Sequence, residues 1–243
     1  MRLDSYLVEA GHVRSRERAK KVIGDGYVWV NGVQVRKAGR SLQPTDRVEF
    51  RGEDFAYVSR AAFKLLAALE AFSFDPQDLL CLDIGASTGG FTQVLCLKGA
   101  RRVYAVDVGH GQLAPEVAGA PPVINLEGVN AKTLTRHEVP EPISFLTCDV
   151  SFISARKVLP AAMALCGPEA IAAILFKPQF ELGPGAIGKG GLVTWDTAAV
   201  ERVVREDMTS FLSEQGWDLI GYLPSPIVGG DGNAEWLVGA RRA

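Results

Sequence analysis

Hydrophobic and polar positions divide most of the chain into alternating strands and helices. Continuous apolar runs predict strands near 79–86, 102–109, 122–126, 143–152, 170–177, 217–223 and 234–242. Helical periodicity predicts helices near 61–69, 91–100, 155–166 and 196–216, although Pro160 disfavours the third of these. Strands that alternate with helices predict an α/β fold, in which helices cover a mostly parallel sheet.

The first 52 residues follow a different pattern. Apolar residues at positions 3, 7 and 8 predict a short helix, and Ser15 is a suitable N-cap for a second one. Asn31-Gly32 is a typical turn between two short strands. We therefore predict a small α+β unit over residues 1–52, a linker at 53–58 and a larger unit at 59–243.

Charge is distributed unevenly between these units. The 243-residue chain has a formal net charge of −2. Residues 1–60 carry 12 Lys and Arg against 8 Asp and Glu, whereas residues 61–243 carry 14 against 20. A basic front on an acidic body indicates that the first unit contacts nucleic acid.

The remaining composition indicates a cytoplasmic protein. The longest strictly apolar run, 170–176, is far shorter than the roughly 18 residues of a membrane span, and the N-terminus lacks the apolar core of a signal peptide. The 4 cysteines form no CxxC pair, and the 3 histidines are scattered without ligand spacing. We therefore expect reduced cysteines and no metal site.

The second predicted helix is strongly basic, with five basic residues against one Glu over 14–21. A solvated helix face is one interpretation, but basic helices also bind phosphate backbones. The region resembles an S4 RNA-binding domain through Arg2-Leu3-Asp4, Ser15-Arg16 and the Val-Asn-Gly at 30–32. We predict RNA contacts from this unit and from one arginine of the larger unit: Arg2, Arg14, Arg16, Arg18, Lys20, Lys21, Arg36, Lys37 and Arg60.

A glycine-rich turn, DIGASTGGF at 83–91, follows the first strand of the larger unit and would let a ligand approach the backbone. Asp107 ends the next strand, 22 residues after Gly85, where a carboxylate can bind both ribose hydroxyls of a nucleoside. The spacing does not match G-x-G-x-x-G, which disfavours NAD. We predict S-adenosylmethionine as cofactor and S-adenosylhomocysteine as product, with a simple tight turn as the alternative. The predicted cofactor residues are Asp83, Gly85, Ala86, Ser87, Thr88, Gly89, Gly90, Phe91, Asp107, Val108, Asn130 and Asp149.

A second glycine-rich stretch, GPGAIGKGG at 183–191, only partly matches a nucleotide-binding P-loop. Gly190 stands where a hydroxyl residue would bind Mg²⁺, and no helical pattern starts there. We interpret this stretch as a flexible loop, with closure over a substrate as an open role.

Four charged residues stand in apolar surroundings. Lys177 and Asp149 end buried strands. Glu235 opens the last strand, and Lys64 lies in an otherwise apolar helix. Each alone fits a strand-end charge or a snorkelling lysine. Together they predict two lysines and two acids at one edge of the sheet, where buried charges must pair.

These four residues resemble the lysine–aspartate–lysine–glutamate tetrad of FtsJ-type ribose 2′-O-methyltransferases. With an S4 domain in front, the chain resembles the TlyA family, also called haemolysin A, through DIGASTGGFT, YAVDVGHGQL and KGGLV. The resemblance implies a Rossmann-like class I methyltransferase domain with a seven-stranded sheet. It also implies 2′-O-methylation of a cytidine in ribosomal RNA. Because the chain starts at the first S4 helix, we expect large-subunit RNA as substrate, with small-subunit RNA left open.

The implied chemistry suggests a role for each member of the tetrad. A lysine beside the ribose hydroxyl can stabilise the developing alkoxide or accept its proton, and both roles stay open for Lys177. Lys64 and Glu235 are expected to orient Lys177 and the ribose. Asp149 is expected to position Lys177 and the methyl donor, and the reaction needs no metal.

Three rival functions make different predictions. A non-catalytic RNA-binding assembly factor predicts gaps in the tetrad or in the glycine-rich turn, and there are none. A pore-forming haemolysin predicts membrane segments, which the run lengths do not provide. Base methylation predicts a cysteine nucleophile, whereas Cys148 points away from the face of Asp149. We expect ribosomal RNA or ribosomal subunits as partners, with no membrane and no obligate protein partner.

Overall fold

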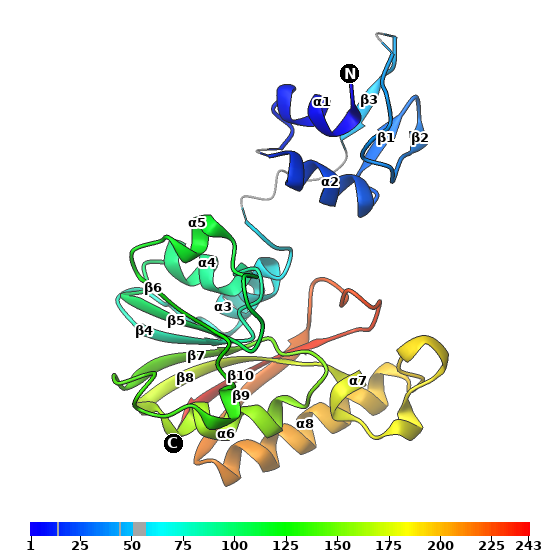
Figure 1. The fold of residues 1–243 in the computed structure, drawn as a ribbon. Helices are drawn as coiled ribbons and strands as arrows, with labels where there is room; N and C mark the ends of the chain where they lie inside the picture. Colours follow the sequence, from blue (N-terminus) through cyan, green and yellow to red (C-terminus); the bar gives the residue numbers. More distant parts are fainter. Residues whose placement is uncertain (14, 44, 51–56) are drawn as a thin grey trace. The chain divides into compact units, whose positions relative to one another are not determined.

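The structure of the protein is a computed structural model that describes residues 1–13, 15–43, 45–50 and 57–243 (Figure 1). It divides into two compact units, Met1–Ala56 and Tyr57–Ala243, and each has its own hydrophobic core. Most of the predicted linker lies outside the described residues. The unit limits at 52 and 59 therefore stay predictions.

The small unit combines two helices with a three-stranded antiparallel sheet in the order β2-β1-β3. Its elements are α1 (Leu3–Glu9), α2 (Arg16–Gly24), β1 (Val28–Val30), β2 (Val33–Gln34) and β3 (Val48–Phe50). Ser15 caps α2 by accepting a hydrogen bond from the Arg18 backbone N–H at 3.2 Å, as predicted. Asn31 and Gly32 both have positive φ, at 53° and 77°, which confirms the predicted hairpin turn.

The large unit alternates strands with helices from residue 62 onward (Figure 1). Its elements are α3 (Ala62–Phe72), β4 (Leu80–Ile84), α4 (Gly90–Leu97), β5 (Arg102–Asp107), α5 (Pro115–Ala118), β6 (Val123–Glu127), η1 (Ala131–Thr133), β7 (Ile143–Cys148), α6 (Ala155–Ala164), β8 (Cys166–Phe176), α7 (Pro178–Glu181), η2 (Pro184–Ala186), η3 (Lys189–Gly191), α8 (Thr197–Glu214), β9 (Trp217–Pro224) and β10 (Trp236–Arg242).

The seven strands form one sheet in the order β6-β5-β4-β7-β8-β10-β9. The five strands from β6 to β8 are parallel, and β10 runs antiparallel to both of its neighbours. Helices α3 and α4 cover one face of the sheet, and α6 and α8 cover the other (Figure 1). The chain moves outward from β4 through β5 to β6, and in the other direction from β7 to β8 and on to the edge strand β9, before β10 returns between β8 and β9. Ligands bind at such a switch point, beyond the carboxyl ends of the strands.

Two details differ from the sequence prediction. Helix α6 continues through Pro160, because its apolar face, which includes Leu159 and Met163, is buried against the sheet. Strand β8 begins at Cys166 rather than near 170, and its pairing with β7 shifts register between Ile143 and Phe145. Glu169, with a φ of 59°, marks this irregular start.

Helix α8 is amphipathic, as its sequence predicts, and is capped by Asp196, whose side chain accepts from the Ala199 N–H at 2.7 Å. The stretch at 183–191 forms the two short turns η2 and η3, not a P-loop that leads into a helix. Among the helices of the described residues, none is both long and apolar enough to cross a membrane.

The packing of β10 on α3 gives a direct test of the fold. A Cβ atom on Gly239 would lie 2.7–2.8 Å from three ring atoms of Phe72, so Gly239→Ala should lower the free energy of unfolding by about 1–3 kcal/mol. Gly221 pairs with Gly239, and its Cβ would meet the same ring at an ordinary 3.6 Å. Gly221→Ala is therefore the matched control in urea unfolding. Equal stability of the two variants would contradict this packing.

Candidate active site

Two loops meet at the carboxyl edge of the sheet, one after β4 and one after β7. Gly85 has a φ of 83°, and a Cβ atom there would lie 2.5 Å from the backbone oxygen of Asp149. Any side chain at position 85 would force these loops apart. The contact with Asp149 therefore explains why position 85 is a glycine. The sequence prediction gave a different reason, which was the approach of a ligand to the backbone.

Two cavities lie beside this contact. The larger, of about 600 Å³, extends over the ends of β4 and β5, and its apolar wall is formed by Ile84, Val106, Val108, Val129, Ile153 and Val158. The smaller, of about 140 Å³, reaches Lys177. Both are lined by Gly85, Ser87, Asp149 and Ser151, which places the cavities next to each other.

Most of the predicted cofactor residues line these cavities. Asp107, Val108 and Asn130 line the larger one. Those lining the smaller one include Ala86, Thr88, Gly90 and Phe91. The Asp107 carboxylate accepts hydrogen bonds from the backbone N–H groups of Ser87 and Gly109, both at 2.8 Å. These bonds fix its orientation and leave lone pairs for further donors.

Two predicted cofactor residues, Asp83 and Gly89, line neither cavity. Gly89 has a φ of 95°, and a Cβ there would meet Leu113 and Val117 at under 3.0 Å. Asp83 is fully buried and accepts hydrogen bonds from the hydroxyls of Thr92, at 2.6 Å, and Thr147, at 2.8 Å. Both residues therefore support the glycine-rich turn at 83–91 from the side away from the two cavities. Burial raises the pKa of the Asp83 carboxyl to about 6, although the two threonine hydroxyls oppose this rise.

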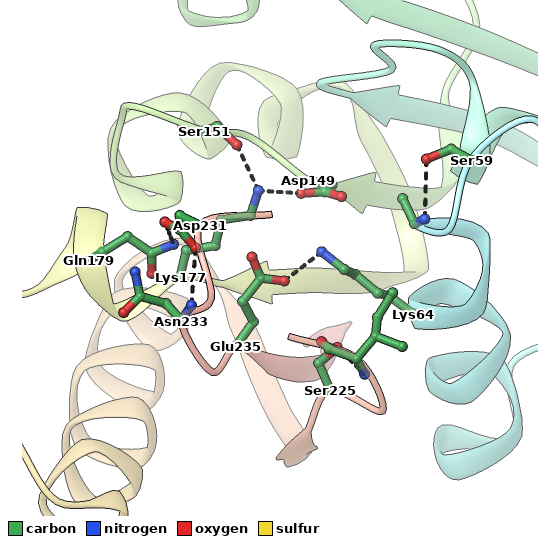
Figure 2. A network of polar contacts seen from close by, with 12 residues as sticks. Ser59, Lys64, Asp149, Ser151, Lys177, Gln179, Ser225, Asp231, Asn233 and Glu235 are labelled. Carbon is green, nitrogen blue, oxygen red and sulfur yellow. Dashed lines mark hydrogen bonds and ion pairs between the residues drawn. The ribbon is translucent and has the colours of Figure 1, made fainter. Parts of the chain in front are cut away.

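The four predicted tetrad residues gather at the same edge as two ion pairs (Figure 2). Lys64 Nζ lies 2.5 Å from Glu235 Oε2, and Lys177 Nζ lies 2.6 Å from Asp149 Oδ1. Lys64, Lys177 and Glu235 are all less than a tenth exposed. Burial raises the pKa of Glu235, while Lys64 opposes the rise. Charges this deeply buried persist only when paired, as they are here.

The pairing differs from the predicted network in one respect. Lys64 and Glu235 contact each other, whereas Lys177 contacts Asp149 and also donates a hydrogen bond to Ser151 Oγ at 2.8 Å (Figure 2). Ser151 was not predicted from the sequence, because its partner lies 26 residues away on the next strand.

A second set of contacts holds the segment that carries Glu235. The buried Asn233 accepts from the Val193 N–H at 2.9 Å and donates to the Gly191 backbone oxygen at 3.0 Å. Gln179, in α7, donates to Asp231 at 3.0 Å (Figure 2). The loop that we predicted to be flexible is thus tied to the turn before β10. Sequence reasoning missed these residues, as it missed Gln112 and Lys132 in the larger cavity.

An exposed aromatic residue stands beside the tetrad. Phe152 is 92% exposed and has a φ of 64°, a backbone conformation that is uncommon for a bulky residue. Its ring centroid lies 5.4 Å from that of Phe180, and it lines the larger cavity. Cys148 is buried, lines neither cavity, and has a thiol pKa raised well above its usual range by burial.

Some of the predicted RNA-binding arginines of the small unit contact other residues of the protein. Arg2 and Arg16 both contact the buried Asp4, at 3.0 and 3.3 Å, yet keep side chains 52% and 57% exposed. The hydrogen bond from Arg2 holds the pKa of Asp4 well below its usual range. Arg36 donates to the Gly24 backbone oxygen at 2.8 Å.

The other predicted RNA-binding residues differ in their exposure to solvent. Lys20, Lys21 and Lys37 are exposed, whereas Arg18 and Arg60 are half-buried. Arg14 lies outside the described residues. Among the residues that the structure describes, no group of three or more His, Cys, Asp or Glu could hold a metal ion.

The sheet order and the site at its carboxyl edge define the methyltransferase fold that uses S-adenosylmethionine. Four solved structures of three methyltransferases, 13% to 16% identical to this chain, share it, with TM-scores of 0.51 to 0.56. A model of FtsJ-like methyltransferases matches residues 57–242, and a model of the S4 domain matches residues 1–48. The chain belongs to the FtsJ-like methyltransferase family and, within it, to the TlyA proteins.

Relatives that match over nearly the whole chain are named either as rRNA methyltransferases or as hemolysins. The 16S/23S rRNA (cytidine-2′-O)-methyltransferase TlyA of Mycobacterium tuberculosis is 39% identical over 241 residues, which span 99% of this chain and 89% of the relative. The 23S rRNA (cytidine-2′-O)-methyltransferase TlyA of Campylobacter jejuni is 33% identical over 98% of both chains. The solved structure of a hemolysin candidate of Streptococcus thermophilus is 35% identical to this chain, with a TM-score of 0.78. The match spans 100% of this chain and 88% of the hemolysin chain.

The raised pKa of Asp83 predicts a pH-dependent stability. Its protonated form is favoured by folding, so its contribution to stability is complete below the unfolded pKa and is lost as the pH rises through about 6. Between pH 4.5 and 7.5, the native chain should lose about 2 kcal/mol of unfolding free energy relative to Asp83→Asn. Urea unfolding of both proteins at each pH measures this difference. A difference that stays constant with pH would show that Asp83 does not titrate in this range.

Proposed function

We propose that this chain transfers a methyl group from S-adenosylmethionine to the ribose 2′-hydroxyl of a cytidine in ribosomal RNA. The observation that carries the proposal is the pair of buried ion pairs at the carboxyl edge of the sheet, next to a cavity of nucleoside-binding character. The names of the M. tuberculosis and C. jejuni relatives support the substrate. Both names include 23S RNA, so we propose large-subunit RNA as the first substrate.

The residues present fit S-adenosylmethionine. Asp107 offers a fixed carboxylate for ribose hydroxyls, and the apolar wall of the larger cavity suits adenine. The smaller cavity, which adjoins it, suits the aminoacyl end. Asp149 Oδ1 is buried without an aligned hydrogen-bond donor among the described residues, although it is paired with Lys177. When bound, the cofactor supplies an electrophilic methyl group on a positively charged sulfur.

We assign the central role to Lys177. Its side chain lines the smaller cavity, and its ammonium group can donate a hydrogen bond to the ribose oxygen as negative charge develops there. Asp149 holds this ammonium in place through its ion pair. The Lys64–Glu235 pair forms the neighbouring wall of the site and orients the ribose.

The RNA-binding surfaces are assigned from exposure and charge. The small unit, proposed as residues 1–52, binds RNA phosphates through its exposed Lys20, Lys21 and Lys37. Arg2 and Arg16 contribute from fixed positions on Asp4. In the large unit, proposed as residues 59–243, Phe152 offers a face on which a base can stack. A ribosomal substrate implies that the protein works in the cytoplasm.

Replacing Lys177 with Ala tests the catalytic assignment. Removing the donor should lower methyl transfer to purified ribosomal subunits by at least about 100-fold, because developing charge on the ribose oxygen loses its stabilising partner. Transfer of labelled methyl groups measures the rate, and nuclease digestion locates the label on the ribose. Lys98→Ala, in an exposed lysine outside the site, is the control. Unchanged transfer by Lys177→Ala would overturn the assignment.

Replacing Phe152 with Ala tests the stacking face. Loss of one base–aromatic contact should lower kcat/KM for the RNA substrate by about tenfold, because the base loses its stacking partner. Phe152→Tyr keeps an aromatic face and should retain most of the activity. If the Ala and Tyr variants lose activity equally, the ring does not act by stacking, and the uncommon backbone conformation is the property that matters.

A further inference from the structure

Lys177 is held by two residues of one loop. Its Nζ donates to Ser151 Oγ at 2.8 Å and lies 2.6 Å from Asp149 Oδ1 (Figure 2). An ammonium group has three N–H donors, and the bond to Ser151 uses one of them, while Asp149 attracts the group through its charge. The side chain of lysine is long and flexible, and a single ion pair leaves it several orientations. The hydrogen bond to Ser151, added to the ion pair, restricts the directions in which the other N–H groups can point.

Ser151 occupies a suitable position for this task. It is one of four residues that line both cavities, so it lies where the adenosine and aminoacyl ends of the proposed methyl donor would join. The loop behind it is braced by Glu181, a buried carboxylate that accepts from Ser154 Oγ and from the Ala155 N–H, both at 2.6 Å. The Arg156 guanidinium adds a third bond to Glu181, at 3.0 Å.

The chemistry also favours a hydroxyl as the second acceptor. Asp149 already supplies one negative charge to Lys177. A second carboxylate would neutralise the ammonium further and weaken its attraction for the developing alkoxide. A neutral hydroxyl directs the ammonium without cancelling its charge. Glu235 cannot replace it, because that carboxylate is paired with Lys64.

We infer that Ser151 is a positioning residue, whose Oγ accepts a hydrogen bond from Lys177 and so directs an unused N–H of that lysine toward the ribose 2′-oxygen. The inference rests on the proposed function of Lys177. It goes beyond the tetrad, since Ser151 completes the geometry that Asp149 alone leaves loose.

The first test compares Ser151→Ala with Ser151→Thr, which restores the hydroxyl. With S-adenosylmethionine and ribosomal subunits both saturating, the single-turnover rate of Ser151→Ala should fall roughly tenfold, while KM for the subunits changes by less than about twofold. Ser151→Thr should recover the rate to within about threefold of the native chain. Ser154→Ala removes a neighbouring hydroxyl bonded to Glu181 and not to Lys177, so it controls for general loosening of the loop.

The second test does not depend on activity. In ¹⁵N spectra of the free protein, a buried ammonium held by a hydrogen bond and an ion pair exchanges its protons slowly and gives a resolved Nζ signal. Lys177→Arg identifies that signal by its loss. We expect the signal in the native chain and in Ser151→Thr, and its loss by fast exchange in Ser151→Ala.

The two tests separate the inference from the function on which it rests. An active native chain whose Ser151→Ala variant keeps both the rate and the Nζ signal would overturn the inference alone. A fall in rate that Ser151→Thr does not restore, or that Ser154→Ala matches, would also overturn it. A native chain that methylates no ribosomal substrate would overturn the proposed function, and the Nζ signal would still decide whether Ser151 holds Lys177.

Discussion

The site depends on one constraint, which is that charges removed from water must be paired. Lys64, Lys177 and Glu235 are almost completely buried, and an isolated buried charge would cost more than a domain of this size can tolerate. The two ion pairs meet this requirement by bringing together α3, the ends of β7 and β8, and the start of β10. Pairing therefore fixes both the electrostatics of the site and the positions of the segments around it.

Supporting contacts extend this constraint to the surrounding loops. Gly85 allows the loops after β4 and β7 to touch, and Asp83 anchors the first of them through two threonine hydroxyls. Glu181 braces the second, and Asn233 ties the glycine-rich loop to the turn before β10. The side chains of the candidate site are thus held by buried polar groups that do not themselves line the two cavities. Buried polar groups of this kind are satisfied by hydrogen bonds, which makes the arrangement specific as well as stable.

In the small unit, one buried residue positions two arginines of the proposed RNA-binding surface. Asp4 is fully buried and holds both Arg2 and Arg16, whose side chains remain half exposed. The carboxylate therefore presents two guanidinium groups in fixed positions, which under the proposed function would lower the entropic cost of each contact with a phosphate. Basic residues counted in the sequence are not equivalent: some are bound to the protein itself, as Arg36 is to Gly24, and others face solvent.

Local patterns in the sequence determined the α/β class, the strand and helix order, the Asn31-Gly32 turn and the identity of the four charged residues, because each follows from periodicity, turn chemistry or polarity in apolar surroundings. Only the tertiary structure decided which lysine pairs with which acid, that Asp83 and Gly89 lie beneath the cavities, and that Ser151 contacts Lys177. These contacts join residues up to 171 positions apart. A local pattern reports how a segment buries its own apolar face, whereas the partner of a buried charge is set by which strands become neighbours in the sheet.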